Sequence, residues 1–277
     1  MRIFAFTFCC LLAVAVAFTG CKRMPNDGIP FYMKIDSVVL LDNNNDPTTL
    51  SHNITDVWVE AGADNLGAYE LPCEFPVLQE GPVNFVISAG VWMSGQQGYR
   101  MIYPFYDIDT MVLNAERDGR YTHIAKFKYK PGLTFNINGD FETNSEFDGM
   151  SPISNDSVKY GTSCGIITVD NIDSTKLAYT IDSFDLPSGR EVWLEFDFKS
   201  TVPFYVGYFG LMPTGGTSKT DALALNPRYD WRKVYLKLSE LLASTQANYY
   251  KIYFEAVKPT TTNGGSVYID NVKLVYF

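Results

Sequence analysis

The sequence predicts an all-β protein with two folded units. Apolar and polar residues alternate in short runs such as MKIDSVVLL, VNFVIS and VWLEFDFKS, which is the period of two expected for strands. Turn-forming clusters such as NNND, LPSG and TTNGG separate these runs. Only LSELLASTQ has a helical pattern, and we expect it to form a helical turn on a loop. Strands without long intervening helices favour sandwiches or jelly rolls over a parallel sheet.

Residues 1–20 have the features of a secretory signal peptide. Arg2 precedes the uncharged run FTFCCLLAVAVAF, which is shorter than the roughly 18 apolar residues that indicate a membrane-spanning helix. The following FTGC resembles the lipobox of bacterial lipoproteins, with Phe18 where leucine is usual. This resemblance implies cleavage before Cys21 and lipidation of that cysteine. An ordinary secretory signal with an unmodified cysteine is the other interpretation.

Three segments follow the signal peptide. Residues 21–31 include KRMPNDGIP, a polar stretch broken by proline and glycine that we expect to tether the lipid to the fold. Residues 32–131 are expected to form the first unit, because Pro131 and Gly132 indicate a boundary. Residues 132–277 are expected to form the second unit, which shows the same alternation.

Composition narrows the classes of partner. A net charge of -9 argues against a nucleic-acid partner, because such binding needs clustered lysine and arginine to displace counterions. The aromatic content of 15% is high and calls for either strands or a binding surface. Outside the signal peptide and Cys21, the only cysteines are Cys73 and Cys164. Two cysteines are too few for a disulfide framework. One bridge would be compatible with this count, but we expect two separate buried thiols.

The second unit carries motifs at both of its ends. NGDFE begins at Asn138, and VYIDNVKL follows close to the carboxyl terminus. Together they resemble the galactose-binding-like jelly rolls that serve as carbohydrate-binding modules. The resemblance implies a structural calcium ion held by Glu142 and Asp270, where the first strand meets the last. It also implies that Trp231, in DWRKVYLKL, packs in the core.

The first unit also resembles a known family. ITDVWVEA, GAYELPCEFPVLQEG and YPFY are similar to the amino-terminal, Ig-like β-sandwich of lipoproteins from the Bacteroidetes. This resemblance implies a lipid-anchored protein of the outer membrane. Either side of that membrane is compatible with the sequence, and no ligand of the first unit is implied.

Acidic residues around NGDFETN raise the question of a metal. Calcium needs six to eight oxygen ligands, which Asp140, Glu142 and Asp270 could supply together with backbone carbonyls. The metal would then join two strands and take no part in catalysis. The other interpretation is that these acids are solvated turn residues in an acidic chain.

The segment VWLEFDFKS is the candidate for a catalytic site, because it carries two acids at alternate positions. Alternation places Glu195 and Asp197 on one face of a strand, which partly resembles the Glu, Asp, Glu pattern of jelly-roll glucan hydrolases. The third position is Lys199. A retaining glycosidase needs two carboxyl groups about 5 Å apart, and this strand lacks the second outer acid. We therefore expect a protein that is not an enzyme.

Outward aromatic residues favour a binding function. Alternation assigns five rings to the polar faces of four strands, beside charged residues that could bind sugar hydroxyls while the ring stacks on the sugar. We therefore expect the jelly roll to bind a polysaccharide. The other interpretations are that this face packs against the first unit, or that it docks on a protein partner in an outer-membrane complex. The five residues are Trp193, Tyr205, Tyr235, Tyr249 and Tyr253.

Overall fold

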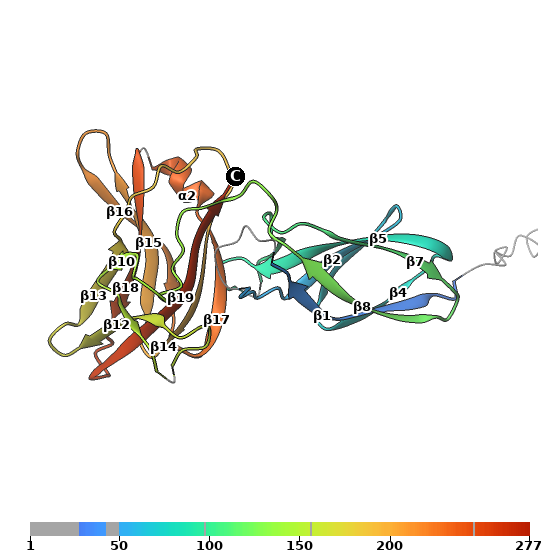
Figure 1. The fold of residues 1–277 in the computed structure, drawn as a ribbon, viewed down its shortest axis with the longest axis horizontal. Helices are drawn as coiled ribbons and strands as arrows, with labels where there is room; N and C mark the ends of the chain where they lie inside the picture. Colours follow the sequence, from blue (N-terminus) through green and yellow to red (C-terminus); the bar gives the residue numbers. More distant parts are fainter. Residues whose placement is uncertain (1–27, 43–49, 97, 156, 246) are drawn as a thin grey trace, which may run out of the picture.

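The computed structural model describes residues 28–42, 50–96, 98–155, 157–245 and 247–277, which form two β-sandwiches joined end to end (Figure 1). The predicted signal peptide, Cys21 and most of the predicted tether lie outside these residues. The prediction of an all-β fold is confirmed, and the described residues contain one short helix, α2 (Ser239–Ser244), where LSELLASTQ predicted it. No described helix has the length and apolar character needed to cross a membrane.

The first unit contains two sheets with the strand orders β4-β1-β8 and β3-β2-β5-β6, and β7 also pairs with β5. All pairs are antiparallel except β1 and β8, the first and last strands of the unit, which run parallel. Alternating residues of the two sheets face a shared core. The strands are β1 (Phe31–Leu40), β2 (Asp56–Ala61), β3 (Asp64–Glu70), β4 (Cys73–Val77), β5 (Gly81–Trp92), β6 (Arg100–Ile102), β7 (Asp109–Ala115) and β8 (Arg120–Phe127).

The second unit is a jelly roll of two facing antiparallel sheets. Their orders are β10-β13-β18-β15-β16 and β11-β12-β19-β14-β17, and β9 pairs with the end of β19. The strands are β9 (Thr134–Phe135), β10 (Phe147–Asp148), β11 (Ser151–Ile153), β12 (Cys164–Asp170), β13 (Thr175–Thr180), β14 (Val192–Ser200), β15 (Phe204–Leu211), β16 (Thr217–Leu225), β17 (Arg228–Lys237), β18 (Tyr249–Val257) and β19 (Gly264–Tyr276).

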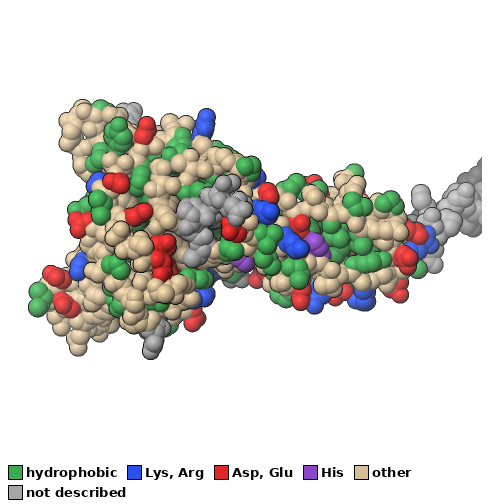
Figure 2. Space-filling model, in the orientation of Figure 1, with side chains coloured by type: hydrophobic (Ala, Val, Ile, Leu, Met, Phe, Trp, Pro, Cys, Tyr) green, Lys and Arg blue, Asp and Glu red, His purple; other side chains and the backbone are tan. Residues whose placement is uncertain are grey.

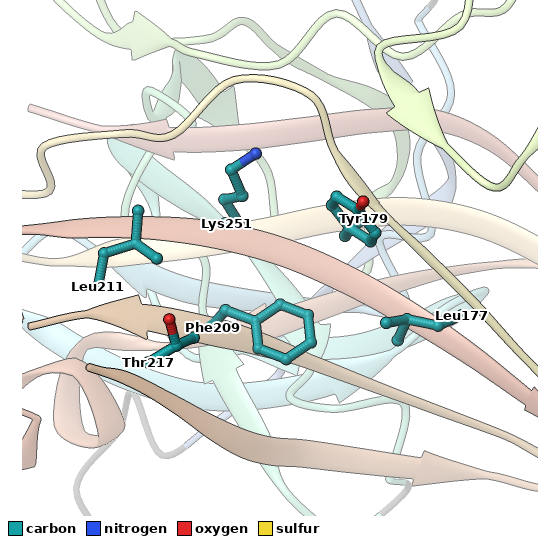
Figure 3. A pocket seen from close by; sticks show the side chains of 6 residues that line it. All are labelled: Leu177, Tyr179, Phe209, Leu211, Thr217 and Lys251. Atoms are coloured by element: carbon teal, nitrogen blue, oxygen red, sulfur yellow. The ribbon is translucent and has the colours of Figure 1, made fainter. Parts of the chain in front are cut away.

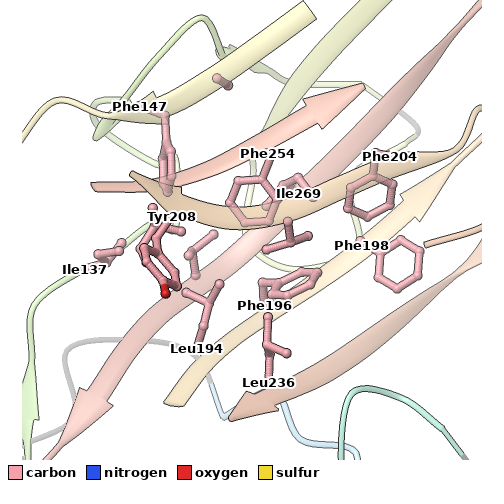
Figure 4. Packing of buried hydrophobic residues seen from close by; sticks show 14 of the residues in the cluster. Ile137, Phe147, Leu194, Phe196, Phe198, Phe204, Tyr208, Leu236, Phe254 and Ile269 are labelled. Atoms are coloured by element: carbon pink, nitrogen blue, oxygen red, sulfur yellow. The ribbon is translucent and has the colours of Figure 1, made fainter. Parts of the chain in front are cut away.

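Aromatic rings fill the space between the two sheets of the jelly roll (Figure 4). Phe196 of β14 packs edge-on against Phe254 of β18, with ring centroids 5.2 Å apart, and Phe198 packs in the same way against Phe204. Each fully buried phenylalanine contributes about 1.5–3 kcal/mol by leaving water. This core fixes which face of each strand remains for other contacts.

The end of the first unit covers the outer face of β14, β17 and β19. Trp193, Tyr235 and Val275 of the jelly roll belong to the hydrophobic core of the first unit and are fully buried there. The backbone also joins the units, because the amide of Ser94 donates a 2.8 Å hydrogen bond to the carbonyl of Tyr235 beside a parallel bridge between Met93 and Tyr235. The outer face of the jelly roll therefore completes the core of the first unit, while the space between the two sheets of the jelly roll holds a second core.

The remaining surface of both units mixes acidic, basic and hydrophobic side chains on the face seen in Figure 2. The two cysteines of the described chain are free, as expected of separate thiols. Cys73 is half-buried on β4, and Cys164 is buried on β12. Burial raises the pKa of the Cys164 thiol to about 12, so this thiol stays protonated and unreactive at neutral pH.

Candidate functional site

The five aromatic residues predicted to bind a ligand lie on two different faces. Trp193 and Tyr235 lie on the face that the first unit covers, with exposed fractions of 0% and 1%. Tyr103 of the first unit packs against both rings, at centroid distances of 5.4 and 4.8 Å. The prediction that these two rings contact a ligand is therefore wrong. Packing of this face against the first unit, one of the alternatives, is what the structure has.

Glu195 and Asp197 lie on the same covered face and are fully buried. Tyr103 and Tyr129 donate hydrogen bonds to Glu195, and the ammonium of Lys233 forms an ion pair with its carboxylate at 3.0 Å. Ser51 of the first unit donates a 2.5 Å hydrogen bond to Asp197. These acids are structural groups, because the first unit keeps substrates away from them.

Charge pairing decides the protonation of this buried network. Burial alone would raise the pKa of Glu195, but the ammonium groups of Lys233 and Lys273 outweigh it and hold the pKa below its ordinary value. Burial alone would lower the pKa of Lys233, yet Glu195 and Asp197 raise it. Both partners therefore carry their charges at neutral pH.

The outer face of the sheet β10-β13-β18-β15-β16 lies away from the first unit and carries the other three predicted rings (Figure 1). Tyr205 and Tyr249 are 37% and 49% exposed. Tyr253 is buried because its ring lies over Gly207 of the neighbouring strand, where a Cβ would come within 2.6 Å of the tyrosine hydroxyl. Its hydroxyl donates a hydrogen bond to Asp221. Tyr253 thus supports the face from below and cannot itself stack on a ligand.

An open apolar pocket of about 260 Å³ lies on this face (Figure 3). Phe209 forms its centre, 5.0 Å from the ring of Tyr253 and 6.3 Å from that of Tyr179. The ammonium of Lys251 lies 5.4 Å from the ring of Tyr179 and donates a hydrogen bond to the carbonyl of Ile181. The lining residues, from four strands, are Leu177, Tyr179, Phe209, Leu211, Thr217 and Lys251.

Polar groups surround this pocket in fixed positions. Tyr179 donates a 2.8 Å hydrogen bond to Asp148, and Lys219 forms a 2.5 Å ion pair with Glu255. Burial, and then Asp221, raise the pKa of Tyr253, so its hydroxyl remains a donor across the accessible pH range. The arrangement therefore places half-exposed rings among held hydrogen-bonding groups, as a site for a polar ligand with an apolar side requires.

Sequence reasoning missed Tyr179 and Phe209. Phe209 follows Tyr205 by four residues on the same strand, so the alternation that marked Tyr205 as outward also marks Phe209. Tyr179 lies opposite Tyr253 in the adjacent strand. That pairing depends on the order of strands in the sheet, which the alternation within a single strand does not predict.

The three acids of the predicted calcium site lie in one corner of the jelly roll. Asp140 accepts a hydrogen bond from the amide of Glu142, whose carboxylate is bound by the amides of Thr162 and Ser163. Asp270 is buried, and its Oδ2 has no hydrogen-bond partner within the described structure. Burial, then the charges of Asp197, Glu142 and Asp140, raise the pKa of Asp270 to about 8.

A cation fits this corner, because an unpartnered buried carboxylate with acidic neighbours is stabilised by a positive charge. Asp270 and Glu142 are the residues that would hold it, completed by backbone carbonyls. A set of three acidic, histidine or cysteine side chains arranged around one point is absent from the described residues.

The implied core position of Trp231 is wrong. Trp231 lies on β17, partly exposed, and its indole donates a 2.8 Å hydrogen bond to the carbonyl of Ser157. Alternation from the buried Val234 and Leu236 leaves position 231 on the outer side of the sheet.

Comparisons with known proteins identify structural neighbours only. No family model and no curated protein sequence matches the chain. A xylan-binding CBM22-1 domain from Paenibacillus barcinonensis Xyn10C is 13% identical over 52% of this chain and 94% of that domain, with a TM-score of 0.40. A family 11 carbohydrate-binding module of Clostridium thermocellum Lic26A-Cel5E is 15% identical over 52% and 95%, with a TM-score of 0.36.

The enzymatically active domain of tailspike protein 4 from bacteriophage CBA120 is also similar. It is 15% identical over 57% of this chain, with a TM-score of 0.39, and the similar part spans 25% of the tailspike chain.

Proposed function

We propose that this protein is a non-catalytic lipoprotein of the cell envelope that binds a polysaccharide on the outer face of the sheet β10-β13-β18-β15-β16. The observation that carries the proposal is the row of rings at Tyr205, Phe209 and Tyr249 on a sheet face that the first unit leaves free. The first unit occupies the Trp193 face, so a protein partner has no access there.

The chemistry of this face suits a sugar chain. The apolar C–H side of a pyranose ring stacks on an aromatic face, while its hydroxyl groups need charged or amide partners at the edge. Phe209 and Tyr249 offer rings on neighbouring strands, and Lys251 lies opposite Phe209, two residues after Tyr249 on β18. An elongated, open surface of this kind can contact several successive sugar units.

Replacing Phe209 or Tyr249 by alanine is expected to weaken polysaccharide binding about tenfold, because each change removes one stacking surface worth about 1.4 kcal/mol. The measurement is retardation of residues 22–277 in native gels that contain neutral xylan, mannan or β-glucan. Tyr99→Ala is the matched control, since Tyr99 is a 61% exposed ring on the first unit. Equal mobility of all variants in every polysaccharide would exclude binding by this face.

We further propose that a calcium ion stabilises the corner at Asp270. Calcium at 100 times its dissociation constant is expected to add about 2.7 kcal/mol to the free energy of unfolding, and to raise the melting temperature by about 5 °C. Asp270→Asn and Glu142→Gln should abolish this rise, whereas Asp148→Asn, a change to an exposed acid on β10, should retain it. Identical melting in calcium and in chelator would rule the ion out.

The anchor is proposed on the lipobox resemblance at Cys21, which lies outside the described residues. The protein isolated from its host's outer membrane is expected to carry a diacylglyceryl thioether at Cys21, visible in the mass of its amino-terminal peptide. Cys21→Ser should move the protein from the membrane fraction to the soluble fraction. A Cys21→Ser protein that stays with the membrane would argue for another mode of attachment.

A further inference from the structure

The outer face of the sheet β11-β12-β19-β14-β17 is only partly covered by the first unit. Beyond the covered part, Lys199 of β14 extends between two rings, those of Trp231 on β17 and Tyr268 on β19. Its ammonium lies 5.8 Å from the first ring centroid and 5.0 Å from the second. Both rings are partly exposed, so each offers an edge or face to solvent.

A hollow of about 190 Å³ lies beside these rings. Tyr229 lines it and is 81% exposed, which is unusual for a large aromatic side chain. Trp231, next to it, is held in orientation by its hydrogen bond to the carbonyl of Ser157. The lining residues are Ser157, Lys199, Ser200, Thr201, Arg228, Tyr229 and Tyr268.

The charge of this hollow differs from that of the protein as a whole. Among the described residues, neither Lys199 nor Arg228 has a carboxylate within 4 Å, although the chain carries a net charge of -9. Lys219, Lys233 and Lys237 of the jelly roll form ion pairs, whereas Lys199 and Arg228 do not within the described chain. Asp230 is exposed nearby and forms no ion pair with these two cations. Two cations without a paired carboxylate among the described residues therefore lie beside the rings of Tyr229 and Tyr268.

We propose that this hollow binds an acidic sugar, with the sugar ring against Tyr229 and Tyr268 and its anionic group between Lys199 and Arg228. The inference goes beyond the proposed function, since it concerns the opposite sheet and a charged class of glycan. Carboxylate sugars and sulfated sugars share the required chemistry. The fork of the arginine favours bidentate contact with either anion.

The test is retardation of residues 22–277 in native gels that contain polygalacturonate, its fully methyl-esterified form, or dextran sulfate. Polygalacturonate or dextran sulfate is expected to slow the protein more than the esterified, uncharged polymer does. Which of the two acts more strongly identifies the carboxylate or the sulfate as the preferred anion. Equal mobility in all three gels would overturn the proposal.

Lys199→Met and Tyr229→Ala are each expected to weaken this retardation about tenfold, the effect of losing about 1.4 kcal/mol. Lys176→Met removes the same charge from an exposed position on the other sheet and should retain it. Retardation that falls equally in Lys176→Met would show a nonspecific charge effect and overturn the proposal. Phe209→Ala should retain binding to the acidic polymer while its binding to neutral glycans is weakened, so the two sites fail separately.

Discussion

Lys233→Met is expected to lower the free energy of unfolding by about 3–5 kcal/mol, which is the usual cost of removing one partner from a buried ion pair. The change leaves the carboxylate of Glu195, and beyond it that of Asp197, in the interior without their closest cation. Denaturant unfolding measures the loss as a lower midpoint at unchanged slope.

Lys34→Met is the matched control for this experiment, because Lys34 pairs with Asp36 at an exposed position of β1. It should shift the midpoint only slightly. The double variant Lys233→Met with Glu195→Gln should recover part of the lost stability, since a neutral amide still accepts hydrogen bonds from Tyr103 and Tyr129. If Lys233→Met unfolds no earlier than the control, the carboxylates are not desolvated.

Trp193→Ala is expected to cost about 3–5 kcal/mol, because it empties a fully buried site at the contact between the two units. The edge-on contact with Tyr103 and the hydrogen bond from the indole to Glu191 are lost with the ring. The loosened contact should also expose the connection between β8 and β9 to proteases. Unfolding midpoints and limited proteolysis measure the two effects.

Trp231→Ala is the control on the same sheet, and its stability loss should be smaller because that ring is partly exposed. Trp193→Ala should leave binding to neutral polysaccharides intact in the fraction that stays folded. A Trp193→Ala protein with wild-type stability that no longer binds glycans would reverse the assignment of faces made from burial.

Alternation within strands was enough to predict the all-β fold and the two sides of each strand. It correctly placed Trp193 opposite the core residues Leu194 and Phe196. It could not say what lies over that side. The charged neighbours Glu195 and Asp197 made the face look solvated, and their neutralising partner, Lys233, comes from another strand.

The candidate face was predicted only in part for the same reason. Tyr205 and Tyr249 were correctly placed on an exposed face, because both follow the alternation of inward and outward residues along their strands. Tyr253 follows the same period, but its burial depends on Gly207 across the sheet. Whether a neighbouring strand buries an outward ring depends on which residue pairs with it, and the alternation along a single strand does not give that pairing.

Because residues of the jelly roll complete the core of the first unit, the jelly roll cannot be moved alone between proteins without exposing them. A jelly roll cut away near Pro131 would present Trp193, Tyr235 and Val275 to water, around carboxylates that have lost the hydroxyl donors of Tyr103, Tyr129 and Ser51. The smallest piece that can be transferred is therefore the pair of sandwiches. A fusion protein that keeps only the second sandwich would expose an apolar patch with buried carboxylates at its centre, which favours aggregation.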